Sequence, residues 1–192
     1  MNDTTQQFYY GKIKDKDSVE NDVDNFWLNL LPDYFQKKLK YGIEQEARPL
    51  PEVTKQRADW TIRYIKNGDP KKVILIEGNR KGMESQPAQY MKLVRTERNQ
   101  DPKRTLYGAV NIGTYTRFYQ LDPYEQECID YPGTNGKCYE LAGNEAEIHA
   151  ILLNLVQKTS HGENTNGAKI YWKNGKHWYI DSANQWVEYT GA

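Results

Sequence analysis

The chain has few of the residues from which common catalytic and metal sites are built, with two cysteines and three histidines among 192 residues. Two cysteines without a second Cys/His pair at suitable spacing argue against a structural zinc site. The chain also lacks a Gly-rich phosphate loop, a Ser/His/Asp order and a Cys/His nucleophile pair. These absences exclude P-loop nucleotide hydrolysis and the usual nucleophilic hydrolase chemistry.

Long apolar runs are also missing. No segment is long enough to span a membrane, so no membrane partner is expected. The N-terminal stretch MNDTTQQFYYGKIK has no apolar signal region, which favours an intracellular protein, although a mature form that had lost a signal peptide would look the same. Cys128 and Cys138 flank a turn-rich stretch, and two free thiols are favoured over a disulfide.

The composition is that of a globular protein, with 38% hydrophobic residues, 15 tyrosines and 5 tryptophans. The length suits one domain with a core that needs no covalent support. Net charge is zero but unevenly spread: residues 55–104 hold 13 Lys or Arg against 6 Asp or Glu (net +7), and residues 119–150 hold 1 against 7 (net −6). The basic half permits phosphate binding, and the neutral total argues against strong non-specific DNA binding. Ordinary surface charge is the alternative.

A predicted β-hairpin over residues 57–81 is the most informative part of the sequence. Its parts are the strands Ala58–Ile65 and Val73–Glu77, with the turn sequence Asn67-Gly68-Asp69-Pro70 between them. If the turn centres on Gly68, residues whose numbers sum to 136 face each other, so Asp59 lies opposite Glu77 on one sheet face. Two carboxylates that close repel unless a cation or a proton lies between them, and Mg²⁺ suits such a pair. The alternative is a surface pair splayed into solvent.

Asp59, the turn, the apolar strand and the residues Glu77-Gly78-Asn79-Arg80 resemble the PD-(D/E)xK nuclease superfamily. The nearest likeness is to the nuclease domains of type I restriction enzymes and to uncharacterised fungal proteins of the same fold. The resemblance implies that Asp59 and Glu77 bind a metal ion, Mg²⁺ or Mn²⁺, if the site is active; if it is not, no cofactor is expected. Ala58 stands where the family often has proline, and Asn79 stands where it has the catalytic lysine.

The missing lysine decides what function we expect. Strand parity places Lys81 on the face of Glu77, and Arg57 opposite Asn79 on that face, so either could replace the lost charge, although Lys81 is displaced by roughly 6–7 Å. We therefore expect a nuclease-fold protein with impaired catalysis that acts as a nucleic-acid- or protein-binding module. The alternative is an active Mg²⁺-dependent endo- or exonuclease that uses Asp59, Glu77 and Lys81 on DNA or RNA. A different fold, in which the motif is accidental, is a further alternative.

A helix from Ser85 to about Arg98 is predicted after the hairpin. Gln86 and Tyr90 resemble the Gln-x-x-x-Tyr element that borders the active site in the exonuclease branch of the superfamily, and this resemblance implies contact with nucleic acid. Lys92, Arg95 and Arg98 follow on the helix and could line a phosphate track. The alternatives are a packed Tyr90 with a solvated Gln86, and a solvated charged surface for the basic residues.

The remaining predictions concern the fold. Before the hairpin we expect a loose arm over residues 1–21, a helix over Asp22–Tyr41 that Pro32 divides after Leu31, and a loop or edge segment over Gly42–Gln56. Glu44, Glu46 or Glu52 in this last segment could be a third acid of the site. After residue 105 we expect strands Leu106–Ile112 and Thr116–Leu121, an acidic loop Pro123–Leu141, a helix Asn144–Thr159, and a C-terminal hairpin with a third strand at Gln185–Thr190. TRFYQLDP resembles the last core strand of restriction-type nucleases. The expected fold is α/β, a restriction endonuclease-like mixed sheet over residues 22–160 flanked by helices, with a β-meander over 161–192 packed on this core.

Overall fold

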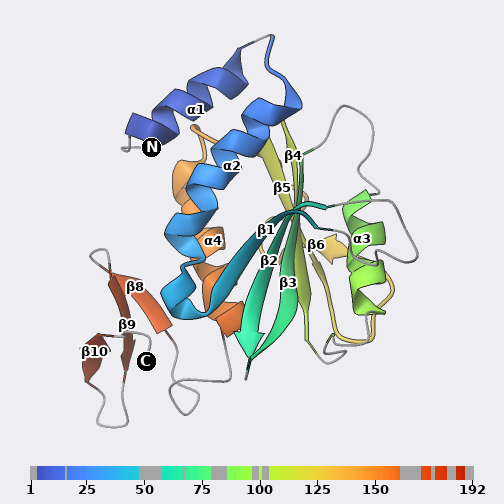
Figure 1. Ribbon diagram of the computed structural model, residues 1–192, viewed down its shortest axis with the longest axis vertical. Helices are drawn as coiled ribbons and strands as arrows, with labels where there is room; N and C mark the ends of the chain where they lie inside the picture. Colours follow the sequence, from blue (N-terminus) through green and yellow to red (C-terminus); the bar gives the residue numbers. More distant parts are fainter. Residues whose placement is uncertain are drawn as a thin grey trace.

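The computed structural model describes residues 4–15, 17–47, 58–66, 68–78, 86–96, 100, 104–160, 170–173, 176–180 and 185–188. Within them the protein is mixed α/β, with a seven-stranded, mostly antiparallel sheet and four helices. α1, α2 and α4 lie on one side of the sheet and α3 on the other (Figure 1). The elements are α1 (Thr4–Lys14), α2 (Glu20–Tyr34), η1 (Lys37–Leu39), β1 (Tyr41–Ala47), β2 (Ala58–Lys66), β3 (Asp69–Gly78), α3 (Gln86–Arg95), β4 (Leu106–Ile112), β5 (Tyr115–Leu121), β6 (Ile129–Asp130), β7 (Tyr139–Glu140), α4 (Glu145–Ser160), β8 (Ile170–Lys173), β9 (Lys176–Ile180) and β10 (Trp186–Glu188).

The N-terminal segment is the helix α1, so the prediction of a loose arm was wrong. Ile13 is buried in the main core, and the Gln6 amide donates a hydrogen bond to Asp33 of α2 at 3.0 Å. The sequence of α1 has only a weak amphipathic pattern and contains Gly11. Because such short helices are marginal alone, α1 is stabilised by packing on α2 rather than by propensity.

α2 continues to Tyr34, so the prediction that Pro32 ends the helix after Leu31 was also wrong. Pro32 lies in the last turn, where its missing N–H removes one intrahelical donor. The N–H of Phe35 still donates to the carbonyl of Leu31 at 2.9 Å and closes that turn. The buried side chains of α2, among them Phe26 and Trp27, hold the helix on the sheet despite the proline.

The main sheet has the strand order β1-β2-β3-β4-β5, and both β6 and β7 pair with β5. β1, β2 and β3 are antiparallel neighbours, β3 and β4 are parallel, and β4 and β5 are antiparallel. A parallel pair needs a crossover connection, and α3 supplies it between β3 and β4. The segment expected to be a loop or an edge is the edge strand β1, and the two strands predicted at 106–121 are β4 and β5.

The β2–β3 hairpin has two registers. Next to the turn, Lys66 pairs with Asp69, and the residue numbers sum to 135. Farther out, Trp60 pairs with Ile76, and the sum is 136. Val73 is the extra residue on β3, which makes a β-bulge. The expected register was therefore wrong beside the turn and right at the far end of the hairpin, because the bulge shifts it by one residue.

Two apolar clusters lie on the two sides of the sheet. The larger one joins buried side chains of α1, α2 and α4 to one sheet face. The smaller one consists of Ala58, Leu75, Met91, Val94, Leu106 and Leu121 and lies between α3 and the other face. Tyr90 and Val94 are buried, as predicted for the apolar stripe of α3.

The C-terminal part has the elements that its sequence predicts. α4 buries its expected stripe, which is Ile148, Ile151, Leu152, Leu155 and Val156. β8, β9 and β10 form an antiparallel meander in which Trp172 pairs with His177, and β8 contacts α4. Cys128 and Cys138 are free thiols. Among the described residues, no helix has the length and apolar character that crossing a membrane requires.

Candidate cation and nucleic-acid site

Asp59 and Glu77 lie opposite each other near the ends of β2 and β3. Trp60 pairs with Ile76, and the next position on each strand is Asp59 and Glu77. Because side chains alternate along a strand, Glu77 shares the sheet side of Leu75, which belongs to the smaller apolar cluster under α3. At the start of β2, Ala58 belongs to this cluster and Trp60 to the larger one, so strict alternation does not hold there, and the register alone assigns Asp59 to the side of Glu77. Glu77 is only 7% exposed and Asp59 is half-buried, so the pair is not splayed into solvent.

Glu77 lies in an apolar part of the sheet. In the parallel pairing, Glu77 stands beside Val110 of β4, which is 4% exposed. A carboxylate in such a place is costly to ionise unless a cation or hydrogen bonds stabilise it. In the part of the chain that the structure describes, no group of three or more His, Cys, Asp or Glu side chains is arranged to hold a metal ion. Mg²⁺ needs only one or two carboxylates, because it retains several waters, so the pair fits this ion better than zinc.

β1 brings two of the three candidate third acids near this pair. Glu44 forms an ion pair with Arg63 at 2.7 Å and is thereby committed. Glu46 lies at the register position opposite Asp59 and has a φ of 51°, in the left-handed region that residues other than glycine rarely adopt. Glu52 lies outside the described residues. Of these two acids, the structure therefore favours Glu46 over Glu44 as the third acid of the site, a choice that the sequence alone could not make.

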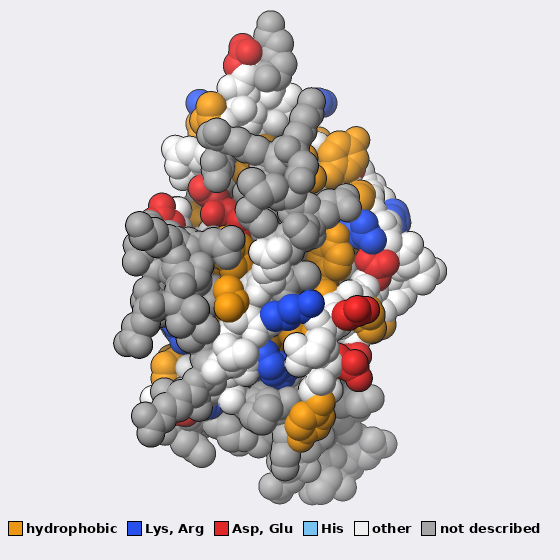
Figure 2. Space-filling view, turned by 90° about the vertical axis from the view of Figure 1, so that its right-hand side faces the viewer, with side chains coloured by type: hydrophobic (Ala, Val, Ile, Leu, Met, Phe, Trp, Pro, Cys, Tyr) orange, Lys and Arg blue, Asp and Glu red, His pale blue; other side chains and the backbone are white. Residues whose placement is uncertain are grey.

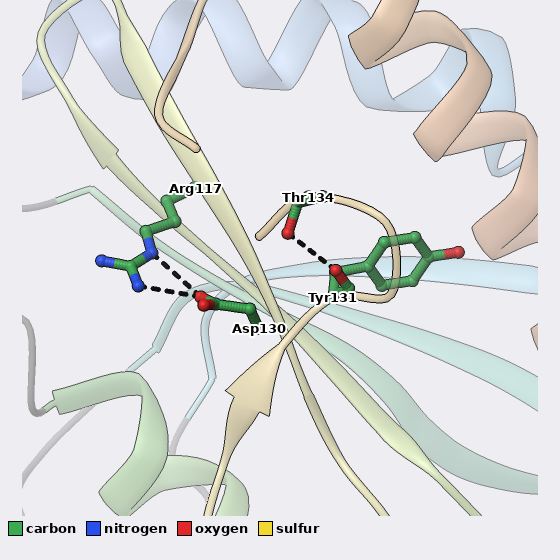
Figure 3. A network of polar contacts seen from close by, with 4 residues as sticks. All are labelled: Arg117, Asp130, Tyr131 and Thr134. Atoms are coloured by element: carbon green, nitrogen blue, oxygen red, sulfur yellow. Dashed lines mark hydrogen bonds and ion pairs between the residues drawn. The ribbon is translucent and has the colours of Figure 1, made fainter. Parts of the chain in front are cut away.

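The row of residues that contains Glu77 continues across β4 to Arg117 of β5. Val110 pairs with both Glu77 and Arg117. The Arg117 side chain is turned toward Asp130, and its Nε and Nη2 donate to Oδ1 of that residue at 3.1 and 2.8 Å (Figure 3). These hydrogen bonds raise the pKa of Arg117 above its ordinary value. Gly136 has a φ of 73°, and a Cβ there would lie 3.2 Å from Nη2 of Arg117, so the ion pair needs glycine at this position.

The turn that carries Asp130 is fixed from both sides. The hydroxyl of Thr134 donates to the carbonyl of Tyr131 at 2.7 Å, and the ring of Tyr131 points away from Asp130 (Figure 3). On that other side, the Tyr131 hydroxyl donates to Asn154 of α4 at 2.9 Å. Arg117 is thus held in an ion pair with Asp130.

The start of α3 lies at the level of the carboxylate pair. A Cβ on Gly108 would be 3.2 Å from Sδ of Met91, and Gly108 pairs with Leu75, so Met91 lies over this pair. Gln86 precedes Met91 by five residues, about 7.5 Å along the helix axis. Glu77 follows Leu75 by two residues, about 6.6 Å along the strand. Since α3 runs back along the sheet toward the start of β4, its first turn reaches the row of Glu77.

The other end of α3 is far from the acids. The guanidinium of Arg95 donates to three backbone carbonyls, which belong to Arg104, Leu121 and Asp122, at 2.5, 3.0 and 3.1 Å. Leu121 pairs with Leu106, four residues before Val110 on β4, so these acceptors lie roughly 13 Å along the strands from the row of Glu77. Arg95 therefore fastens α3 to the end of β5.

The other predicted site residues are only partly described. Tyr90 is 4% exposed, which fits the packing alternative, and Lys92 is exposed. Gln86 opens α3, and its side chain is not described. Asn79, Lys81 and Arg98 lie outside the described residues.

Thr61 is a residue of this face that the sequence reasoning missed. It lies two positions after Asp59 on β2 and is 1% exposed. Its hydroxyl has no hydrogen-bond partner among the described residues. The alternation of β2 was the available signal, because it places Asp59 and Thr61 on one face.

Figure 2 shows the side of the molecule that carries α3. Lys or Arg and Asp or Glu side chains lie beside one another there, and the described side chains form no large field of one sign. The mixed charge of the described side chains agrees with the zero net charge of the chain.

The chain matches no known family model, no curated protein and no solved structure. The likeness to the PD-(D/E)xK superfamily therefore depends on the residues and their arrangement alone.

Proposed function

We propose that this chain is a nuclease-fold protein of the PD-(D/E)xK type that binds a divalent cation and nucleic acid and has lost most of its catalysis. The observation that carries the proposal is the carboxylate pair Asp59 and Glu77 on adjacent antiparallel strands, with Glu77 7% exposed. These two residues would hold Mg²⁺ or Mn²⁺, which supplies a charge for a phosphate oxygen and lowers the pKa of bound water.

The arrangement around the pair supports the restriction endonuclease-like fold. α2 is followed by three antiparallel strands, then α3, then β4 parallel to β3. This order of helix, strands, helix and strands is the one that the superfamily core has. The first turn of α3 lies at the level of Glu77, which is where the likeness to Gln-x-x-x-Tyr needs Gln86.

Impaired catalysis follows from the missing cation. Asn79 is neutral and cannot stabilise the charge that develops on phosphate. Two cations of this side of the sheet are engaged elsewhere, Arg63 with Glu44 and Arg117 with Asp130. We therefore expect this protein to bind a divalent cation and nucleic acid but to cleave nucleic acid poorly.

The second candidate is an active Mg²⁺-dependent nuclease with Lys81 in place of the lysine. β3 keeps strand geometry through Gly78, so strand parity favours Lys81 on the face of Glu77. The long stem of a lysine would then span part of the displacement.

Calorimetric titration with Mn²⁺ tests the proposal. Wild type should bind the ion, and Asp59→Asn and Glu77→Gln should each weaken binding by at least about tenfold, because each removes a carboxylate ligand. Glu44→Gln is the matched control, since Glu44 lies on β1 of the same sheet but is paired with Arg63. Equal binding by wild type and both site variants would retire the cation site.

Cleavage and binding of oligonucleotides separate the two candidates. In the binding module, wild type holds labelled DNA or RNA without cutting it, and Asn79→Lys introduces cutting. In the active enzyme, wild type cuts, and Lys81→Ala reduces the rate by about 10²–10⁴-fold. An absence of both cutting and nucleic-acid binding, in wild type and Asn79→Lys alike, would leave only a protein-binding role.

A further inference from the structure

Two threonines of the main sheet are fully buried with hydroxyls that have no hydrogen-bond partner among the described residues. Thr61 on β2 and Thr116 on β5 are each 1% exposed. Most buried polar groups in folded proteins are paired, since an unsatisfied hydroxyl costs about 1–3 kcal/mol. The two residues differ in what surrounds them.

Thr116 lies on the side of the larger cluster. It pairs with Asn111 of β4 and with Tyr139 of β7, whose ring belongs to that cluster. Asn111 is also 1% exposed, and its amide has no partner among the described residues. This polar pair is therefore separated from Asp59 and Glu77 by the sheet itself.

Thr61 lies on the side of the acids. It follows Asp59 by two residues, and it pairs with Leu75, which precedes Glu77 by two residues. The Cα atom of Thr61 therefore lies roughly 6.6 Å from that of Asp59 and roughly 7–8 Å from that of Glu77. That separation is long for a direct hydrogen bond from a short side chain, but one bridging water fits it.

We propose that Thr61 is a positioning residue of the cation site, whose hydroxyl hydrogen-bonds to a water ligand of the ion held by Asp59 and Glu77. The inference rests on the proposed function. A hydroxyl offers one donor and two acceptor positions, so it accepts from a coordinated water, which is a stronger donor than bulk water. Thr61 would fix the orientation of that water and add to the affinity for the ion.

The test compares the isosteric variants Thr61→Val and Thr116→Val with Thr61→Ser. Mn²⁺ affinity is measured by calorimetry, and thermal unfolding is measured in chelator. Removing an outer-shell partner typically lowers metal affinity by about 10–100-fold, so Thr61→Val should bind Mn²⁺ at least about tenfold more weakly. Thr61→Ser should restore the affinity, because it keeps the hydroxyl. Thr116→Val should bind like wild type.

The unfolding temperature of Thr61→Val in chelator tests whether the role of Thr61 is purely structural. Because the hydroxyl would be satisfied only by the ion's water, Thr61→Val should unfold at the wild-type temperature or above. A Thr61→Val protein that is destabilised or unfolded in chelator would overturn the inference, and so would one that binds Mn²⁺ like wild type. If wild type itself bound no Mn²⁺, or if Glu77→Gln bound equally well, the proposed function would fail first. If wild type bound and Glu77→Gln did not, an unchanged Thr61→Val would refute only the role of Thr61.

Discussion

The two sides of the main sheet differ in how much apolar surface they bury and in which of them holds the buried carboxylate Glu77. The side covered by α1, α2 and α4 holds the large aromatic core, in which Trp27, Trp60 and Tyr41 are almost wholly buried. On the side covered by α3, the smaller cluster has six buried members among the described residues. The buried residues Glu77 and Thr61 face this second side.

The difference indicates that one side of the sheet supplies most of the stability and the other carries the candidate site. Hydrophobic stabilisation scales with the apolar area removed from water, so the larger cluster supplies most of it. The α3 side can then carry a buried carboxylate, which costs more free energy than a buried neutral polar group unless it is paired. A binding site is expected on the side where stability is not concentrated, and the carboxylate pair is on that side.

Phe118→Ala should give the largest effect. Phe118 is 1% exposed in the larger cluster, and its ring lies edge-on to Tyr139 with centroids 6.1 Å apart. Loss of a buried aromatic ring typically lowers the free energy of unfolding by about 3–5 kcal/mol. Urea unfolding followed by tryptophan fluorescence measures it. A loss of less than about 1 kcal/mol in the free energy of unfolding would contradict the inference that the larger cluster supplies most of the stability.

Met91→Ala on the α3 side should cost less, about 2 kcal/mol, the low end for this substitution. Met91 is wholly buried and packs over Gly108, but its cluster is small and ends at α3. The same urea experiment compares the two variants directly. If Met91→Ala cost as much as Phe118→Ala, the two sides would contribute equally and the comparison would fail.

Local sequence chemistry predicted much of the fold. The Asn67–Pro70 turn and the alternation of the flanking strands predicted the hairpin, because both signals lie within one segment of the chain. They did not fix its register: the register beside the turn would pair Asp59 with Ile76, and the bulge at Val73 restores the register that brings Asp59 to Glu77. The stripe of α4 was likewise readable from its own spacing. What failed depends on distant partners: α1 is a helix through its packing on α2, and the bulge at Val73 shifts the register by one residue.

The site shows the same limit. Arg95 was assigned to phosphate from its position on the helix, yet its guanidinium bonds to carbonyls up to 27 residues away in sequence. The burial of Thr61 could not be read from the sequence, because it depends on what covers the sheet. Residue identity predicted which chemistry is available, and tertiary contacts decided which residues take part.

The reactivity of the two cysteines measures local opening on the α3 side, which costs less free energy than unfolding of the whole protein. Cys128 packs against the smaller cluster, and burial raises its pKa from 9.0 to about 11, while Cys138 is exposed. Because the thiolate is the reactive form, Cys138 should react at least about tenfold faster than Cys128 with a disulfide reagent at pH 8. Cys128→Ser and Cys138→Ser separate the two rates. Met91→Ala should speed the reaction of Cys128 alone, and an equal acceleration of both thiols would indicate global rather than local opening.

Tyr10→Phe should give the smallest effect, and it tests whether α1 belongs to the large side. The Tyr10 hydroxyl donates to Oε1 of Glu140 at 2.7 Å, and this hydrogen bond raises the tyrosine pKa from 10.0 to about 12. A pKa raised on folding means that the folded state favours protonated Tyr10, so the hydrogen bond contributes fully below pH 10 and is lost as pH rises toward 12. The partial exposure of Tyr10 limits the contribution to about 1 kcal/mol or less.

Wild type should therefore lose stability between pH 10 and 12 more steeply than Tyr10→Phe in urea titrations, with Tyr9→Phe on the same helix as the control. Identical pH profiles for wild type and Tyr10→Phe would show that α1 is not tied to the sheet through Glu140.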